Sequence, residues 1–271
     1  MRAGEGVTLA AYATRWVQRR RVRGRPLRLR TVVGYERVLR LHVLPALGQV
    51  PVGELTRRQV RSWYDELVEV KGAGVAAGSY ALLRAICATA VEDELLTTTP
   101  CSLRGAGKRW SPERPVLTVE QLLALAAAIA PRYRAVVLLG GFCCLRIGEL
   151  SALQRSAVDL QAATVTVRAS AGYIAGHGFV IGEPKSVSSR RVVTIPAAVL
   201  PDVQAHLERY VGPEPEAVVF TGPLGGRLPG GAFAGSFAAA RGRLRADKRD
   251  APSPARGPLQ GDCITSSELF P

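Results

Sequence analysis

Apolar residues recur at helical spacing through the first hundred residues. An i, i+3, i+4, i+7, i+8 pattern predicts a helix over residues 7–20, with its inner face made by Leu9, Tyr12, Ala13, Trp16 and Val17. A second helix is expected from Thr31, to be stopped by Pro45. Its buried side is expected to comprise Val32, Tyr35, Val38, Leu39 and Leu41.

Two further helices complete this first region. Thr56 and Gln59 have the spacing of a capping box, which predicts a helix with Val60, Trp63, Tyr64 and Leu67 facing inward. Glycines at 72 and 74 interrupt the chain, and an alanine-rich helix is expected over 75–95. The polar segment 97–107 is interpreted as a connection at a domain boundary. Residues 7–105 therefore predict an all-α bundle of about four helices.

The pattern from residue 113 to 246 mixes helices and strands. A second capping box at Thr118 and Gln121 opens helices over 119–129 and 131–143. Alternation from Thr164 predicts a strand, 172–182 and 190–195 are expected as two more, and helices are expected over 196–211 and 232–246. Residues 247–271 are polar and proline-rich without periodicity, which predicts a disordered tail.

Positive charge is concentrated near the N-terminus. The chain has 36 Lys and Arg against 22 Asp and Glu, a net charge of +14, and residues 1–60 hold 13 arginines and 3 glutamates. Such a field favours a polyanionic partner, most simply double-stranded DNA. A membrane surface is the competing polyanion, but the basic run 19–25 resembles a linker or loop and lacks a sharply amphipathic face.

Arg19, Arg20, Arg21 and Arg37 are the candidate DNA-phosphate contacts, with a solvated charge run as the alternative for the first three.

Membrane and metal signals are weak. The longest apolar run, 135–145, has 11 residues, whereas a membrane span needs about 20. No signal peptide is evident, and the five cysteines contain no C-x-x-C pair, so we expect a cytoplasmic protein with reduced cysteines. No cofactor or metal is expected. Cys143 and Cys144 are interpreted as core residues rather than a redox pair.

One stretch, residues 140–153, holds an arginine in an apolar setting. Arg146 and Glu149 are spaced to share a helix face, and Leu145, Ile147, Leu150 and Leu153 are expected to form an apolar stripe. An arginine there is costly to desolvate unless a carboxylate or phosphate meets it. A purely structural ion pair with Glu149 is the alternative.

Three segments together resemble the tyrosine recombinases, the phage integrase family. Residues 140–160 contain Leu-Arg-Ile-Gly-Glu-Leu and resemble the family's first arginine box, and 183–196 resemble its β-hairpin lysine segment. Residues 12–16, 31–35 and 42–48 are similar to its helical core-binding domain. The resemblance implies a multi-domain protein: an all-α, SAM-like core-binding domain and an α+β catalytic domain.

The resemblance also implies a chemistry that needs no metal or nucleotide. A tyrosine attacks a DNA phosphodiester to form a 3′-phosphotyrosyl link, which a 5′-hydroxyl later reverses. Arg146 would grip the scissile phosphate, Lys185 would protonate the leaving 5′-oxygen, and Glu149 would support the arginine segment. The alternative for Lys185 is a solvated lysine in a turn.

The sequence departs from the family after about residue 240. No His-x-x-Arg follows the last expected strand, and no tyrosine follows Tyr210, so no nucleophile is assigned. We expect an incomplete catalytic domain, as a frameshift or gene decay would produce, that is inactive as written. The alternatives are a non-catalytic DNA-binding protein that occupies recombination sites and an inert gene remnant. The expected partners are DNA and further subunits, either copies of this chain or an intact recombinase.

Overall fold

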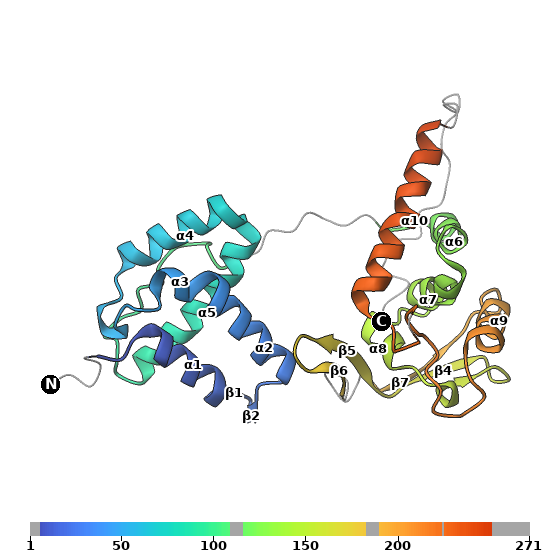
Figure 1. Cartoon of the computed structure of the whole chain (residues 1–271), viewed down its shortest axis with the longest axis horizontal. Helices are drawn as coiled ribbons and strands as arrows, with labels where there is room; N and C mark the ends of the chain where they lie inside the picture. The colour runs from blue at the N-terminus through green and yellow to red at the C-terminus, as the bar shows by residue number, and fades with distance from the viewer. Residues whose placement is uncertain (1–5, 109–115, 183–189, 224, 251–271) are drawn as a thin grey trace. The chain divides into compact units, whose positions relative to one another are not determined.

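The computed structural model describes residues 6–108, 116–182, 190–223 and 225–250, with side chains described as far as residue 244 (Figure 1). The chain forms two compact units. Unit 1 holds the residues up to Pro115 and unit 2 those from Val116 onward, the turn Ile174–Gly176 excepted.

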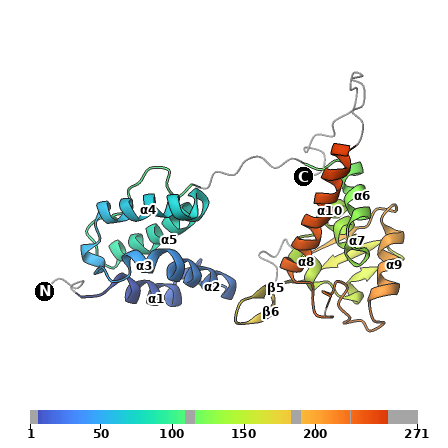
Figure 2. The ribbon, with the colours of Figure 1, turned by 45° about the horizontal axis from the view of Figure 1, so that its top comes forward.

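Unit 1 is built from helices and one short two-stranded ladder. Its elements in chain order are α1 (Leu9–Arg19), β1 (Arg21–Val22), β2 (Arg25–Pro26), α2 (Leu29–Val38), a π-helical turn (Leu39–Val43), α3 (Leu44–Leu47), a 3-10 turn (Val52–Glu54), α4 (Arg57–Lys71) and α5 (Ala73–Glu92). Helices α4 and α5 pack side by side, and α1 contacts α2 and α3 (Figure 2).

The ends of α1 and α4 follow local chemistry. The Thr8 side chain accepts a hydrogen bond from the Ala11 backbone N–H at the start of α1. The capping box predicted at Thr56 is confirmed, because Thr56 and Gln59 each accept a hydrogen bond from the other's backbone N–H. All five residues predicted for the inner face of α1 are buried.

The second predicted helix differs from its prediction. Pro45 does not stop it, since the helical path runs through the π-helical turn into α3, where proline occupies the first turn and needs no N–H partner. Leu41 is 42% exposed, whereas Leu39, Val43 and Leu47 are buried. The wider π turn keeps residues four apart on one face, and the Trp63 indole N–H donates to the His42 carbonyl within it at 2.6 Å.

Two segments predicted as linkers are folded in unit 1. The basic run 19–25 includes a tight hairpin in which Val22 pairs with Arg25, and its turn residues Arg23 and Gly24 have φ of 51° and 75°. The predicted connection 97–107 packs on the helices instead of separating domains. There the Leu103 backbone N–H donates to the Tyr80 hydroxyl at 2.8 Å.

Helix α5 is the central apolar element of unit 1. Among the described residues it is the one helix with the length and apolar composition to cross a membrane, but half of that window is buried within unit 1. It begins at Ala73, two residues earlier than predicted, directly after Gly72 with φ of 85°. Its buried side chains include Tyr80, Leu83 and Ile86. The core therefore accounts for its apolar character.

Unit 2 combines helices with two small sheets. Its elements are α6 (Val119–Ala128), α7 (Pro131–Phe142), α8 (Ile147–Ala152), a 3-10 turn (Arg155–Ala157), β3 (Val158–Asp159), β4 (Thr164–Val167), β5 (Ser170–Ile174), β6 (Gly178–Gly182), β7 (Arg191–Thr194), α9 (Leu200–Tyr210) and α10 (Gly230–Asp250). Strands β3, β4 and β7 form an antiparallel sheet, and β5 pairs with β6. Helix α10 lies along α6 in both ribbon views (Figures 1 and 2).

Several helix and strand boundaries in unit 2 differ from their predictions. The single strand predicted over 172–182 is a hairpin, because Gly176 and Gly178 at φ of 77° and 72° reverse the chain. Helix α9 starts at Leu200 rather than 196, and α10 continues to Asp250, four residues into the predicted tail. Residues 251–271 lie outside the described part of the chain. The capping box at Thr118 is confirmed.

His206 is a buried titratable group in the core of unit 2. The residue is 5% exposed, and its ring packs at a tilt against Phe220 and Tyr210, with centroids 4.8 and 5.2 Å away. Burial lowers the pKa of His206, and the positive charge of Arg132 lowers it further, although a hydrogen bond with the Val219 carbonyl opposes both. The unfolded chain therefore binds a proton at His206 more readily than the folded chain does.

We expect unit 2 to lose stability as the pH falls below about 6.5, the ordinary histidine pKa. The lost stability should return on raising the pH above that value. Urea unfolding between pH 7.5 and 5.5, read from hydrogen exchange of peptides in residues 200–220, measures the effect. His206→Phe, which keeps a ring but no titrating group, should unfold at a urea concentration that is nearly independent of pH. An equal pH dependence in both proteins would assign it to other groups.

Candidate functional site

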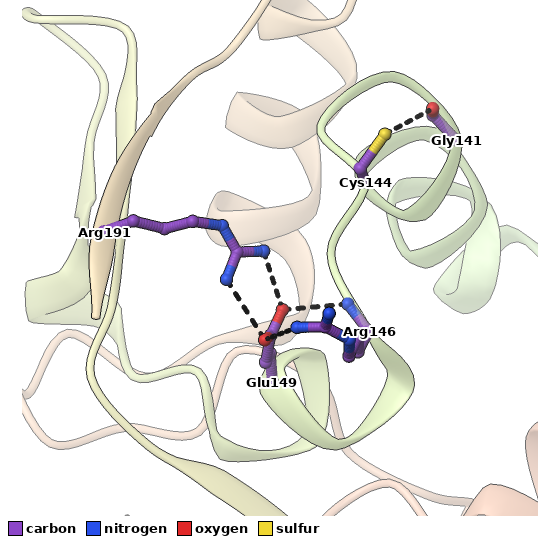
Figure 3. A network of polar contacts seen from close by, with 5 residues as sticks. All are labelled: Gly141, Cys144, Arg146, Glu149 and Arg191. Carbon is purple, nitrogen blue, oxygen red and sulfur yellow. Dashed lines mark hydrogen bonds and ion pairs between the residues drawn. The ribbon is translucent and has the colours of Figure 1, made fainter. Parts of the chain in front are cut away.

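The candidate arginine of unit 2 stands where one helix ends and the next begins. Helix α7 ends at Phe142, Cys144 adopts a left-handed conformation with φ of 50°, and Arg146 is the residue that precedes α8 (Figure 3). The helix predicted over 131–143 ends within one residue of its prediction, and the turn at 143–145 separates it from α8. Cys144 is exposed, so its interpretation as a core residue was wrong, whereas Cys143 is buried.

The Glu149 carboxylate joins two arginines that are far apart in the sequence. Its Oε2 accepts from the Arg146 backbone N–H and from Arg191 Nη2, both at 2.9 Å. Its Oε1 accepts from Arg146 Nη1 and from Arg191 Nη1, both at 3.1 Å. Figure 3 shows both guanidinium groups converging on this one carboxylate. Each oxygen thus receives one hydrogen bond from each arginine.

Burial explains why the carboxylate needs two cations. The Glu149 side chain is 4% exposed, and an ionised carboxylate at such a position is costly unless it is paired and hydrogen-bonded. Burial alone would raise the pKa of Glu149. The hydrogen bonds and charge supplied by Arg191 and the backbone N–H of Arg146 outweigh it, so the pKa lies below its usual value. Glu149 is therefore ionised near neutral pH.

Arg146 itself is exposed, which corrects the expectation of a desolvated arginine. Its side chain is 75% exposed, and Nη1 to Glu149 is its one side-chain hydrogen bond within the described residues. Ile147 is also exposed, while the other members of the predicted stripe, Leu145, Leu150 and Leu153, are buried. An exposed guanidinium with one tethered nitrogen can present its other N–H groups to a phosphate.

Arg191 is the functional candidate that sequence reasoning missed. It lies on β7, opposite Val167 of β4, and its bond to Glu149 raises its pKa above the usual value. It lies within the segment 183–196 that resembles the lysine segment, but helical spacing from Glu149 could not reveal a partner 42 residues away. The sequence did hold one indication of such a partner. A carboxylate inside an apolar segment is costly to bury, and a single exposed arginine does not offset that cost.

Lys185 lies outside the described residues, 39 positions after Arg146 in the sequence. The described chain resumes at Arg190, just before β7, so the strands on either side of the segment are β6 and β7. That Arg146 and Lys185 face one phosphate remains a prediction.

Three of the four candidate DNA contacts gather around one cleft of unit 1. Its volume is about 520 Å³, and its lining includes Arg15, Arg19, Arg20 and Arg21 together with Tyr12, Trp16, Thr89 and Asp93. The Arg20 guanidinium lies 5.3 Å from the centre of the Trp16 ring and donates to the Thr89 hydroxyl at 3.5 Å. Arg37 is exposed on α2 and is not among the lining residues.

One acidic side chain shares this cleft but is already engaged. Asp93 accepts a 2.6 Å hydrogen bond from the Tyr12 hydroxyl, and burial together with this bond raises the pKa of Tyr12. Four arginines and one aspartate leave the lining strongly positive, which suits a phosphate ligand.

Metal-ligating side chains and the last tyrosine were the other candidates for chemistry. No cluster of three metal-ligating side chains occurs in the part of the chain that the structure describes. Tyr210, the last tyrosine, ends α9 against His206 and lies 5.6 Å from the Arg132 guanidinium, measured to its ring centre. These contacts are those of a packed side chain.

Comparisons with known proteins bear on most of the chain. Residues 8–68 match the family model described as phage integrase, N-terminal SAM-like domain. The integrase of Mycobacterium phage FRAT1 is 31% identical over 240 residues, which cover 87% of this chain and 69% of that protein. The chain belongs to the tyrosine recombinase family of phage integrases. The prophage phiRv2 integrase of Mycobacterium tuberculosis is 32% identical over 217 residues, and the match spans 56% of that protein.

Solved tyrosine recombinases share the fold. The Tn1549 transposon integrase, solved with a circular intermediate DNA, aligns with a TM-score of 0.73 at 20% identity and covers 89% of this chain and 80% of its own. A lambda integrase dimer bound to a COC′ core site aligns with a TM-score of 0.64 at 15% identity, covering 87% and 81%. The predicted fold class is therefore confirmed: a SAM-like helical domain and a partial α+β catalytic domain.

Cys144→Gly should stabilise unit 2 by roughly 0.5–1 kcal/mol. A left-handed residue with a Cβ costs about 1–2 kcal/mol, and the greater freedom of glycine in the unfolded chain offsets part of the gain. Urea unfolding measures the change. Cys144→Ala removes the thiol but keeps the Cβ, so it should bring no such gain. If both variants raised the free energy of unfolding equally, the destabilisation at Cys144 would come from its sulfur rather than from its backbone conformation.

Proposed function

We propose that this chain is a DNA-binding member of the site-specific recombinases, which engages duplex phosphates through unit 1 and holds part of a strand-transfer site in unit 2. The observation that carries the proposal is the exposed guanidinium of Arg146, tethered to a buried, ionised Glu149. Such an arrangement presents an exposed cation to a phosphate that gains negative charge during reaction.

The arginine cleft of unit 1 supports the DNA-binding part. Its lining cations, with the surplus of positive charge in residues 1–60, suit a duplex backbone better than a compact ligand. The Tn1549 and lambda proteins were solved on DNA, the lambda integrase as a dimer and as a tetramer on a Holliday junction. We extend to this chain both DNA binding and assembly, with copies of itself or with an intact recombinase, in the cytoplasm.

In the proposed chemistry Arg146 contacts the scissile phosphate and Lys185 protonates the leaving 5′-oxygen. The attacking group would be a tyrosine oxygen, which loses its proton to solvent and forms a phosphotyrosyl bond as the P–O5′ bond breaks, so that the bond energy is kept and no nucleotide is consumed. These 271 residues contain no tyrosine beyond Tyr210. We therefore propose that they do not cleave DNA alone. A non-catalytic protein that occupies recombination sites is the second candidate, and the lack of a tyrosine beyond Tyr210 favours it. An inert gene remnant is the third candidate.

DNA binding by the full chain should weaken steeply with salt. About five phosphate contacts would give a slope near −4.5 for log K against log salt. Fluorescence anisotropy with a labelled duplex between about 50 and 300 mM salt measures it. Changing Arg15, Arg19 and Arg21 together to Gln should reduce the slope by nearly three units if each contacts a phosphate.

The matched control removes the same charge elsewhere in unit 1. Arg40, Arg57 and Arg58 are exposed, and their joint change to Gln should alter the slope much less. Equal losses from the two triple variants would assign binding to overall charge rather than to the cleft. Affinity that is independent of salt would contradict phosphate binding altogether.

The 271-residue chain should form no covalent complex with DNA. A suicide substrate nicked beside the scissile phosphate, incubated with the protein and run on a denaturing gel, should show no shifted band, because these residues contain no tyrosine beyond Tyr210. An intact family member serves as the positive control. A covalent band that disappears in Tyr210→Phe would show that Tyr210 is the nucleophile and that the chain is an active enzyme.

A further inference from the structure

Arg191 and Arg146 share one carboxylate but stand in different environments. The Arg191 side chain is 29% exposed and lies on β7, where Thr194, Val193, Val192 and Arg191 pair with successive residues of β4. The Arg146 side chain is 75% exposed and extends from the residue before a six-residue helix. The first arginine is held by a sheet, whereas the second can turn toward solvent.

We propose that Arg191 is a positioning residue that keeps the guanidinium of Arg146 available for a DNA phosphate. This proposal rests on the proposed contact of Arg146 with a phosphate, and it adds that this contact depends on the Arg191 guanidinium. Arg191 does not touch the phosphate in this proposal. It acts by donating two hydrogen bonds to the Glu149 carboxylate and neutralising its charge.

The hydrogen-bond pattern supports this division of roles. If Arg146 Nη1 leaves Glu149 for a phosphate, Oε1 still accepts from Arg191 Nη1, and Oε2 still accepts from Arg191 Nη2 and the Arg146 backbone N–H. The buried carboxylate then stays paired in a bidentate ion pair. Without Arg191, the Arg146 guanidinium would be the only cation bound to Glu149 among the described residues, and its departure would leave a buried charge uncompensated.

The backbone bond adds a reason why Arg146 can move without disturbing the helix. Glu149 holds the start of α8 through the Arg146 N–H, which lies in the main chain and does not move with the guanidinium. Arginine carries no acceptor, so it cannot complete a capping box itself. Arg191 therefore fixes the carboxylate, the carboxylate fixes the helix start, and the guanidinium keeps its freedom.

A double-mutant cycle tests the coupling. Arg146→Gln should weaken binding of the full chain to a core-site-length duplex by about tenfold, the loss expected for one charge-assisted contact. In an Arg191→Gln background the same change should cost less than about threefold, because Arg146 is already confined to Glu149. Arg190→Gln is the matched control, since it removes one positive charge from the neighbouring exposed residue and should leave the tenfold effect of Arg146→Gln intact.

A third background separates positioning from folding. Glu149→Gln combined with Arg191→Gln removes the carboxylate that would confine Arg146, so the effect of Arg146→Gln should return to about tenfold. Arg191→Lys keeps the charge without the bidentate geometry and should give an intermediate value. A role of Arg191 in stability alone would predict no recovery in the double background.

A measurement without DNA distinguishes the two hypotheses. Nitrogen-15 relaxation of the Arg146 side-chain Nε–H should report a mobile group in the native chain and an ordered one in Arg191→Gln. Unchanged mobility would overturn the role of Arg191, whatever the DNA data show. Increased order together with no effect of Arg146→Gln on DNA binding would instead overturn the proposed phosphate contact and leave the positioning effect standing.

Discussion

The geometry of the candidate site in unit 2 depends on the pairing of one buried carboxylate. Glu149 ties the start of α8 to β7, two segments that no apolar stripe of the sequence connects. Helix α8 has six residues, too few to be stable alone. Because an unpaired ionised carboxylate at 4% exposure would be strongly destabilising, the requirement for two donors fixes the relative position of these segments. Packing of apolar side chains forms the core of unit 2, and the ion pairs of Glu149 determine the geometry of the candidate site within it.

Unit 1 holds its cations by a different mechanism. One face of α1 packs into the core through Tyr12 and Trp16. Because that face is held in place, the arginines on and just after the helix are positioned around the cleft. Arg20 lies over the Trp16 ring, so a buried aromatic orients a half-buried cation without an ion pair. A carboxylate partner would hold such a cation more tightly but would also cancel its charge. An aromatic partner leaves the field available to a polyanion.

The sequence predicted the features that short-range chemistry determines. The capping boxes at Thr56 and Thr118 and the inner face of α1 depend on residues three or four apart, and all three were confirmed. The exposure of Leu41 was missed because a π-helical turn changes the helical phase, and nothing in the apolar spacing marks such a turn. Arg191 was missed because its partner is distant in the sequence. The reason for singling out Arg146 was wrong, since Glu149 rather than the arginine is desolvated, and its contact with a phosphate remains a prediction.

The two proposed roles make separate demands on the chain. Phosphate binding by unit 1 needs a positive field, and several arginines contribute to it without any one being oriented as strictly as a catalytic group. Strand transfer needs a guanidinium in one position while charge develops on a single phosphate, and it also needs a nucleophile. Binding can therefore persist where cleavage cannot. On the proposal made above, a chain with the arginine cleft and the Glu149 network, but with no tyrosine after Tyr210, would keep the groups that phosphate binding at a DNA site needs. Occupancy of that kind would compete with an intact relative for the same phosphates, which makes the non-catalytic alternative physically coherent.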